Sequence, residues 1–224
     1  PAECGLLMAS TFISDHNASL HQTPSYSAWL ATADFLPVYQ YHKQILQILQ
    51  WKNPRQRWLL KAPEHQVHLD TLLAVYPDAR IVQTHRDPLK CMASTTSLMG
   101  TLYYMRSDAP FNAGMFENII MGEPTAQRLE QVMNQREAGV VPERNIADSR
   151  YQDLMEDPLV CIERTYAHFG MELTEAARSR MVAYLADKPR GKFGAHAYEV
   201  DAARASERAL FRRYQEAYAV PDEI

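Results

Sequence analysis

The chain of 224 residues contains 46% hydrophobic and 22% charged residues, which is ordinary for a soluble globular protein with one buried core. Its formal net charge of -4 argues against a protein that binds nucleic acid through bulk positive charge, so basic residues that matter must act locally. The three cysteines, Cys4, Cys91 and Cys161, are too few for a disulfide framework and indicate core thiols in a reducing, cytoplasmic compartment.

Neither a membrane segment nor a secretory leader is expected, because the sequence has no run of 18 apolar residues and no signal-peptide layout. Pro1 is not a translational start. We therefore expect residues 1–224 to form a single, partial domain of a longer protein.

The first part of the chain alternates predicted helices and a strand. Residues 1–30 indicate loop and short helix, and the spacing of apolar residues over 34–53 predicts a long helix. The apolar run "RWLLKAP" (57–63) predicts a buried strand that is closed by its proline. Residues 64–77 then predict a helix with its apolar residues near one face.

A second strand is predicted at "ARIVQTH" (79–85), directly before a helix over 88–105. Asp87 is a suitable N-cap for that helix, and Pro88 suits its first position.

The remaining chain is predicted to be mainly helical around a third strand. We expect two helices or a kinked one in 112–137, a strand and turn in 144–154, helices in 157–170 and 174–187, a basic loop in 188–200, and an amphipathic helix in 201–218.

This order of elements is typical of an α/β fold with an open parallel sheet and crossover helices. In such sheets, ligands bind at the carboxyl ends of the strands. The residues to consider therefore lie at three strand exits, 61–65, 85–94 and 149–153.

Arg86 stands between a predicted strand and a predicted helix, where its guanidinium, the first helical amides and the helix dipole can face one anion. Ser94 follows about two turns into the helix. A bidentate arginine and a hydroxyl together suit a terminal phosphate. A surface ion pair for Arg86 and a packing role for Ser94 fit these residues equally well.

The triplet His85-Arg86-Asp87 also occurs in the catalytic loop of protein kinases. Here Met92 stands where that loop needs a metal-binding asparagine, and the sequence has neither a kinase glycine-rich loop nor Asp-Phe-Gly. The kinase interpretation is therefore rejected.

Four blocks in order resemble the sulfotransferases that use 3'-phosphoadenosine-5'-phosphosulfate (PAPS), above all their broad bacterial branch. The blocks are "RWLLKAPEH" (57–65), "YPDARIVQTHRDP" (76–88) with Ser94 downstream, "RYQDLMEDPLVCIERTYAHFG" (150–170) and "KPRGKFGAHAY" (188–198). The resemblance implies an open parallel sheet of the P-loop NTPase-like type.

The resemblance also implies a set of nucleotide-binding residues. Arg86 and Ser94 match the family's residues for the 3'-phosphate, and Tyr151 matches a tyrosine beside the nucleotide. Arg190, Gly191 and Lys192 resemble the late basic loop that closes over the same phosphate, although the family's usual order is Arg-Lys-Gly.

Sulfuryl transfer needs a base for the acceptor proton and a cation for the departing phosphate, and it requires no metal. The resemblance implies that Lys61 contacts the transferring group. The cytosolic branch has a histidine two residues after this lysine, whereas here Glu64 and His65 follow Ala62-Pro63. His65, Glu64 or a residue outside this chain remain candidates for the base, and Glu64 also suits the first turn of a helix for structural reasons.

Sulfotransferases of this type hold the 5'-phosphosulfate with a Gly-x-x-Arg-Ser-Gly-Thr-Thr loop near their N-terminus, and nothing similar occurs here. We therefore expect the C-terminal portion of such an enzyme, with a central strand and phosphate loop missing and an exposed apolar seam.

Two other functions stay open. A P-loop nucleotide or small-molecule kinase shares this kind of sheet, but its Gly-Lys-Ser/Thr loop and magnesium-binding carboxylate are not visible. A non-catalytic nucleotide-binding module needs neither. The sequence does not fix the acceptor, which can be a hydroxyl or amine of a small molecule, glycan or peptide, and the aromatic residues of 34–51 either line its pocket or belong to the core.

Overall fold

The computed structural model describes residues 3–21, 23–117, 121–189, 191–192, 194 and 202–223. The α-helices are α1 (Cys4–Met8), α2 (Asp15–Leu20), α3 (Pro24–Leu30), α4 (Leu36–Gln50), α5 (Leu69–Val75), α6 (Pro88–Tyr104), α8 (Gly122–Glu137), α9 (Tyr151–Glu156), α10 (Pro158–His168), α11 (Glu175–Asp187) and α12 (Arg212–Tyr218). Five 3-10 helices accompany them: η1 (Ala9–Thr11), η2 (Pro63–Val67), η3 (Ala113–Phe116), η4 (Glu143–Asn145) and η5 (Ala202–Phe211).

Two parallel strands, β1 (Ile81–His85) and β2 (Ile146–Arg150), form the sheet of the described residues. Their register pairs Ile81 with Ile146 and His85 with Arg150. Both strands therefore end at the same edge, and the residues that follow them, Arg86 and Tyr151, emerge side by side. The predicted α/β fold with a parallel sheet is confirmed.

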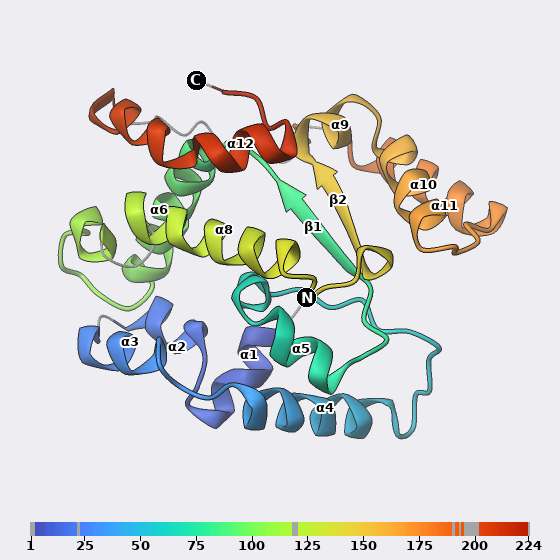
Figure 1. Ribbon diagram of the computed structural model, residues 1–224, viewed down its shortest axis with the longest axis horizontal. Helices are drawn as coiled ribbons and strands as arrows, with labels where there is room; N and C mark the ends of the chain where they lie inside the picture. The colour runs from blue at the N-terminus through green and yellow to red at the C-terminus, as the bar shows by residue number, and fades with distance from the viewer. Residues whose placement is uncertain are drawn as a thin grey trace.

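Helices surround this sheet, and in Figure 1 α8 lies beside β1, on the side away from β2. The beginnings of both strands are covered by α5 and α8, because Ile146 and the partly buried Ile81 pack with Leu69 of α5 and Val132 of α8. At the opposite ends of the strands lies α12, whose Tyr214 bonds to the buried His85.

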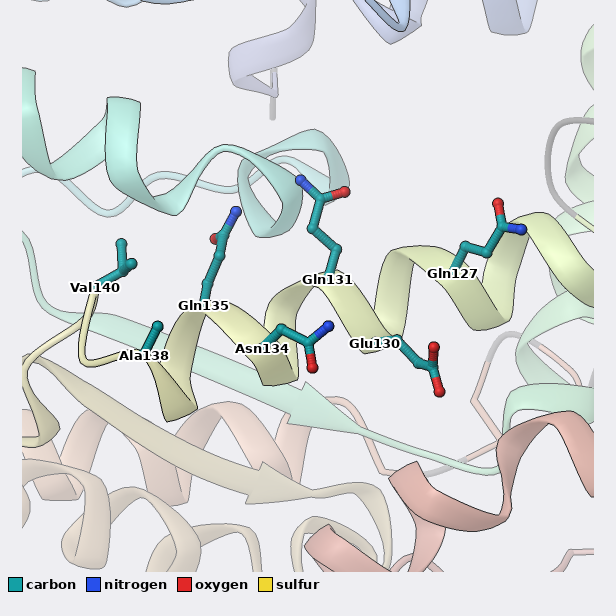
Figure 2. A pocket seen from close by; sticks show the side chains of 7 residues that line it. All are labelled: Gln127, Glu130, Gln131, Asn134, Gln135, Ala138 and Val140. Carbon is teal, nitrogen blue, oxygen red and sulfur yellow. The ribbon is translucent and has the colours of Figure 1, made fainter.

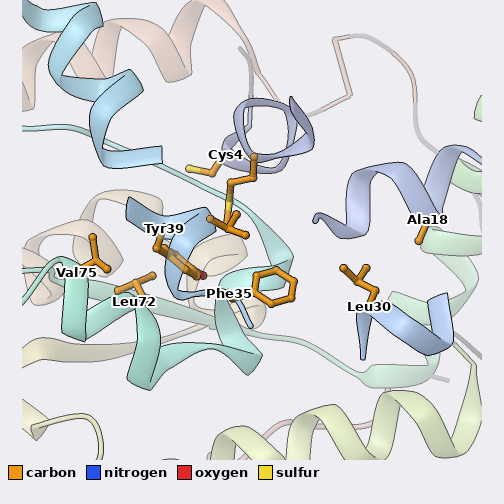
Figure 3. Packing of buried hydrophobic residues seen from close by; sticks show 9 residues of the cluster. Cys4, Ala18, Leu30, Phe35, Tyr39, Leu72 and Val75 are labelled. Carbon is orange, nitrogen blue, oxygen red and sulfur yellow. The ribbon is translucent and has the colours of Figure 1, made fainter. Parts of the chain in front are cut away.

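A separate core joins the N-terminal helices to α4 and α5. Along α4, Val38, Tyr39 and Leu46 are buried at helical spacing, which places them on one face. The cluster is completed by residues of α1–α3 and α5, as Figure 3 shows for Cys4, Ala18, Leu30, Phe35, Tyr39, Leu72 and Val75. The long helix predicted over 34–53 is confirmed.

The predicted buried strand at 57–63 is wrong. Residues 57–61 have no regular secondary structure, and the side chain of Leu59 is fully exposed. Among the described residues, one backbone hydrogen bond joins this run to a distant segment: the Cys4 N–H donates to the Lys61 carbonyl. A strand needs a ladder of such bonds, so the run stays irregular and exposed.

Capping signals located several helices correctly. Asp87 accepts from the Leu89 N–H and begins α6, Asp157 caps α10 in the same way, and Thr174 caps α11. The helix predicted over 64–77 is interrupted at His68, which separates η2 from α5. The helix predicted over 201–218 is η5 followed by α12, and Asp201 lies outside the described residues.

One smaller prediction needs correction. The expectation that all three cysteines are core thiols fails at Cys91, whose side chain is exposed, while Cys4 and Cys161 are buried. The expectation of two helices or a kinked one in 112–137 agrees with the structure, which has η3 and then α8, beginning at Gly122, in the described part of this range.

Candidate functional site

Arg86 is the centre of an anion-binding arrangement at the carboxyl end of β1. Its guanidinium carbon lies 3.8 Å from the centroid of the Tyr151 ring. Its Nε and Nη2 atoms donate to the carboxylate of Glu223 over 2.7–3.0 Å. A stacked guanidinium with a two-pronged anion contact is a geometry that also fits a phosphate.

Asp87 holds the C-terminal segment against this site. Its side chain is fully buried and accepts hydrogen bonds from the backbone N–H groups of Leu89 and Glu223, at 3.0 and 2.8 Å. Arg208 also donates to this carboxylate at 3.1 Å. The cap of α6 thus holds Glu223 beside Arg86, and it uses the Leu89 N–H, which is therefore not available to a bound anion.

A pocket of about 330 Å³ lies beside these groups. It is lined by His85, Arg86, Arg150, Tyr151, Gln152, Met155, Val220, Pro221, Asp222 and Glu223. Two arginines line this pocket. Arg150 forms an ion pair with the nearby Asp153 at 3.0 Å, whereas Arg86 forms its ion pair with Glu223 of the C-terminal segment.

Ser94, Gly191 and Lys192 are not among the residues that line this pocket. Ser94 is half-buried and stands about 9 Å along α6 from Pro88. Gly191 lies in a turn, and Lys192 pairs with Asp187 at 3.4 Å. Arg190 lies outside the described residues.

Lys61 and Glu64 have different structural partners. Lys61 is 68% exposed and forms an ion pair with Glu3. Glu64 is buried, and its carboxylate accepts from the Asp15 N–H at 2.9 Å and from the Ser14 hydroxyl at 3.2 Å. Burial raises the pKa of Glu64, and the Asp15 N–H partly offsets this effect. Glu64 therefore fastens the start of α2.

His65 lies in a polar cluster inside the N-terminal core. Its Nδ1 atom is 2.8 Å from the Tyr39 hydroxyl. Burial, with smaller contributions from His42 and His68, lowers the pKa of His65 to about 4. The imidazole is therefore neutral near pH 7, which is the form that accepts a proton.

The neighbours of His65 were not all anticipated. His68 stacks on Phe35 with ring centroids 3.8 Å apart. The Nδ1 atom of His42 lies 2.8 Å from the Tyr76 hydroxyl, while its buried Nε2 has no partner among the described residues. Sequence reasoning considered Tyr39 only as one of the aromatic residues of 34–51 that either line the acceptor pocket or belong to the core, and did not anticipate its contact with His65.

A buried histidine at the end of β1 was also missed as part of the site. His85 lies 2.8 Å from Asp148 of β2 and 2.9 Å from the Tyr214 hydroxyl of α12. These contacts join both strands to the C-terminal helix. The fixed strand end supports the neighbouring Arg86.

A second, shallow groove of about 430 Å³ runs along α8. Figure 2 shows its side chains, which are mostly amides with the single carboxylate of Glu130. It contains none of the predicted site residues. The pocket at the strand ends, although smaller, offers the charged groups that bind an anion.

Two further searches covered the described ranges. Within them, no three His, Cys, Asp or Glu side chains are grouped closely enough to hold a metal ion. None of the described helices has the length and apolar content needed to cross a bilayer.

Comparison with known proteins agrees with the resemblance. Residues 1–175 match the model of a family described as "Sulfotransferase family". The chain is 31% identical over 134 residues to omega-hydroxy-beta-dihydromenaquinone-9 sulfotransferase Stf3 of Mycobacterium bovis and of Mycobacterium tuberculosis. This match covers 59% of the chain and 34% of each relative, so the chain matches about a third of their length.

Solved structures extend the similarity to the whole fold. Sulfotransferase STF9 from Mycobacterium avium superposes with a TM-score of 0.81 and 27% identity, over 100% of this chain and 57% of that one. Sulfotransferase STF1 from Mycobacterium tuberculosis superposes with a TM-score of 0.77 and 29% identity, over 96% of this chain and 55% of that one.

Proposed function

Because the chain belongs to the sulfotransferase family, we propose that its protein transfers a sulfuryl group from PAPS to an acceptor hydroxyl. The observation that carries this proposal is Arg86, stacked on Tyr151 and bound to a carboxylate at the end of β1. This position and chemistry suit the nucleotide 3'-phosphate.

In the proposed complex, the 3'-phosphate replaces the Glu223 carboxylate on Arg86. Two phosphate oxygens can accept the same pair of hydrogen bonds that the carboxylate accepts now. Tyr151 keeps the guanidinium plane in place. Ser94 and the loop of Arg190, Gly191 and Lys192 are proposed to add donors to this phosphate.

For the chemical step, we propose His65 as the base and assign Glu64 a structural role. The S–O bond to the departing phosphate breaks while the acceptor oxygen bonds to sulfur, and the acceptor proton moves to His65. His65 is neutral in the fold, whereas the oxygens of Glu64 hold Ser14 and Asp15. The ammonium of Lys61 stabilises charge on the departing phosphate. No metal takes part in this scheme.

The acceptor is proposed to be a small molecule with a hydroxyl group on an apolar body. The relative Stf3 is named as a sulfotransferase of omega-hydroxy-beta-dihydromenaquinone-9, a hydroxylated lipid of this kind. We assign the activity to the cytoplasm, where the free thiols of Cys4, Cys91 and Cys161 stay reduced.

The test measures binding of adenosine 3',5'-bisphosphate to the intact protein by calorimetry. Arg86→Ala is expected to weaken binding about 30- to 150-fold, on the order of 2–3 kcal/mol, because a charge-assisted bidentate contact is lost. Arg178→Ala is the matched control, since Arg178 also pairs with a glutamate but lies on α11.

Equal affinity of wild type and Arg86→Ala would refute the 3'-phosphate role. A radiolabelled donor then tests transfer to a hydroxylated lipid acceptor. Nucleotide binding without transfer to any acceptor would favour the non-catalytic module.

A further inference from the structure

A buried histidine stands at the carboxyl end of β1, directly before Arg86. The side chain of His85 has no solvent exposure. Its Nε2 atom lies 2.8 Å from a carboxylate oxygen of Asp148 on β2, and its Nδ1 atom lies 2.9 Å from the hydroxyl of Tyr214 on α12. Both nitrogens of this buried ring therefore have a partner, and the two partners come from different elements.

The chemistry of these partners sets the direction of each hydrogen bond. Burial would raise the pKa of Asp148, but hydrogen bonds from His85 and Arg136 hold it well below its usual range. The carboxylate is therefore ionised and can only accept, so the Nε2 atom of His85 carries a hydrogen. In the neutral imidazole, Nδ1 then accepts, and the Tyr214 hydroxyl donates to it.

The neutral form of His85 also satisfies the hydroxyl of Tyr214. A charged ring would carry a hydrogen on both nitrogens, and the buried O–H of Tyr214 would lose its acceptor in the described part of the chain. Burying a hydroxyl hydrogen without an acceptor is unfavourable. The two side chains therefore form one defined arrangement, with Tyr214 as the donor.

The oxygen of Tyr214 also faces the backbone of Arg86. Burial raises the pKa of Tyr214, and hydrogen bonding from the Arg86 backbone N–H offsets part of this rise. A phenol can accept one hydrogen bond while it donates another, so one hydroxyl serves both His85 and Arg86. Arg86 is the first residue after β1, beyond the paired register of the two strands.

Tyr214 is itself held in a fixed place. Its buried ring packs with Met133 of α8 and with Val220. The neighbouring Tyr218 stacks on His85 with ring centroids 4.2 Å apart. In Figure 1, α12 lies at the ends of the strands. The hydroxyl is thus presented to the strand end from a packed helix.

We propose that Tyr214 is a positioning residue for nucleotide binding, because its hydroxyl fixes His85 and the backbone of Arg86 and so keeps the guanidinium directed at the pocket. This proposal rests on the proposed function, in which Arg86 binds the 3'-phosphate. Tyr214 is not one of the described residues that line the pocket, so it acts through Arg86. A donor that is already in position loses less freedom on binding and binds more tightly.

The test measures binding of adenosine 3',5'-bisphosphate to the intact protein by calorimetry. Tyr214→Phe removes the hydroxyl and keeps the ring, and it should weaken binding about fivefold. In a protein that already carries Arg86→Ala, the same change should have no further effect, because Tyr214 acts through Arg86. A role in fold stability alone would not produce this coupling.

Tyr76→Phe is the matched control. The Tyr76 hydroxyl also lies 2.8 Å from the Nδ1 atom of a buried histidine, His42, but this pair belongs to α4 and the N-terminal core. Tyr76→Phe should lower stability in urea by an amount similar to Tyr214→Phe, since each variant loses one tyrosine–histidine hydrogen bond. Its nucleotide affinity should equal that of the wild type.

Nitrogen NMR with isotope-labelled histidine adds a measurement that needs no nucleotide. In the wild type, His85 should carry its hydrogen on Nε2, with Nδ1 in a hydrogen bond. In Tyr214→Phe, the Nδ1 signal should move to the position of a ring nitrogen without a donor. The wild-type spectrum tests the hydrogen-bond direction even where a variant is poorly folded.

The outcomes separate this proposal from the proposed function. If Arg86→Ala weakens binding but Tyr214→Phe does not, Tyr214 has no positioning role and the function of Arg86 stands. Equal losses from Tyr214→Phe with and without Arg86, or a similar loss in Tyr76→Phe, would also overturn the positioning role. A hydrogen on Nδ1 of His85 would contradict the arrangement. Wild-type affinity in Arg86→Ala would refute both proposals.

Discussion

Arg86 and His65 lie in regions with opposite surroundings. Arg86 stands beside an open pocket, and its charge is balanced by Glu223 and stacked on Tyr151. His65 lies among buried aromatic and imidazole rings, where burial keeps it uncharged. The comparison shows how the surroundings decide charge: Arg86 stays charged beside an open pocket, whereas burial disfavours the protonated form of His65.

The largest expected effect tests whether the buried Glu64 stabilises the fold. Glu64→Ala should destabilise the fold by roughly 3 kcal/mol, because the Asp15 N–H and the Ser14 hydroxyl lose a buried partner. Arg86→Ala should cost about 1 kcal/mol or less, since its ion pair is partly exposed. Urea unfolding measures both values.

Glu64→Gln serves as the control for shape, because its amide oxygen still accepts one bond. It should be less harmful than Glu64→Ala. Equal stability of Glu64→Ala and wild type would contradict the structural role and reopen the catalytic one.

A smaller effect follows from the pKa of His65. Its pKa in the fold is about 4, below the usual 6.5, so the unfolded chain binds more protons as the pH falls. The stabilisation is complete above the unfolded pKa and is lost toward pH 4, by about 2 kcal/mol between pH 7 and 5. Urea unfolding over this range measures the slope.

His65→Gln should flatten that slope. The lowered pKa values of His42 and His68 act in the same direction, so part of the pH dependence should persist. An unchanged slope in His65→Gln would mean that His65 is not buried as described.

The smallest effect concerns the stack at the open site. Tyr151→Leu should weaken binding of adenosine 3',5'-bisphosphate about fivefold, close to 1 kcal/mol, because Arg86 loses its ring contact. Tyr184→Leu removes a second cation–ring contact, the one with Lys188, and should leave calorimetric affinity unchanged. Equal losses of nucleotide affinity in the two variants would contradict a direct role of Tyr151 at the binding site.

Sequence reasoning succeeded where the signals are local. The Asp-Pro pairs before α6 and α10 and Thr174 before α11 are caps whose effect is confined to one turn. The same reasoning predicted strand exits at 85–94 and 149–153, and the structure pairs these two strands, so that Arg86 and Tyr151 leave the sheet at the same edge.

Sequence reasoning failed where a residue distant in sequence determines the local structure or the side-chain contact. The apolar run at 57–63 reads as a strand, but a strand also needs a neighbour, and apolar content does not supply one. Glu223 meets Arg86 across 137 positions, and no local pattern signals such a contact. Tyr39 and His65 likewise meet only after α4 and η2 pack together.

In the proposed complex, the carboxylate of Glu223 on Arg86 makes ligand binding an ion exchange. A phosphate that arrives releases an anion already bound, so few dissolved counter-ions are gained or lost, and added potassium chloride should weaken binding only slightly. The tethered carboxylate also competes with chloride at high local concentration. In the proposed complex a doubly charged phosphate displaces the carboxylate, so we expect this exchange to select for phosphate before any base or sugar is recognised.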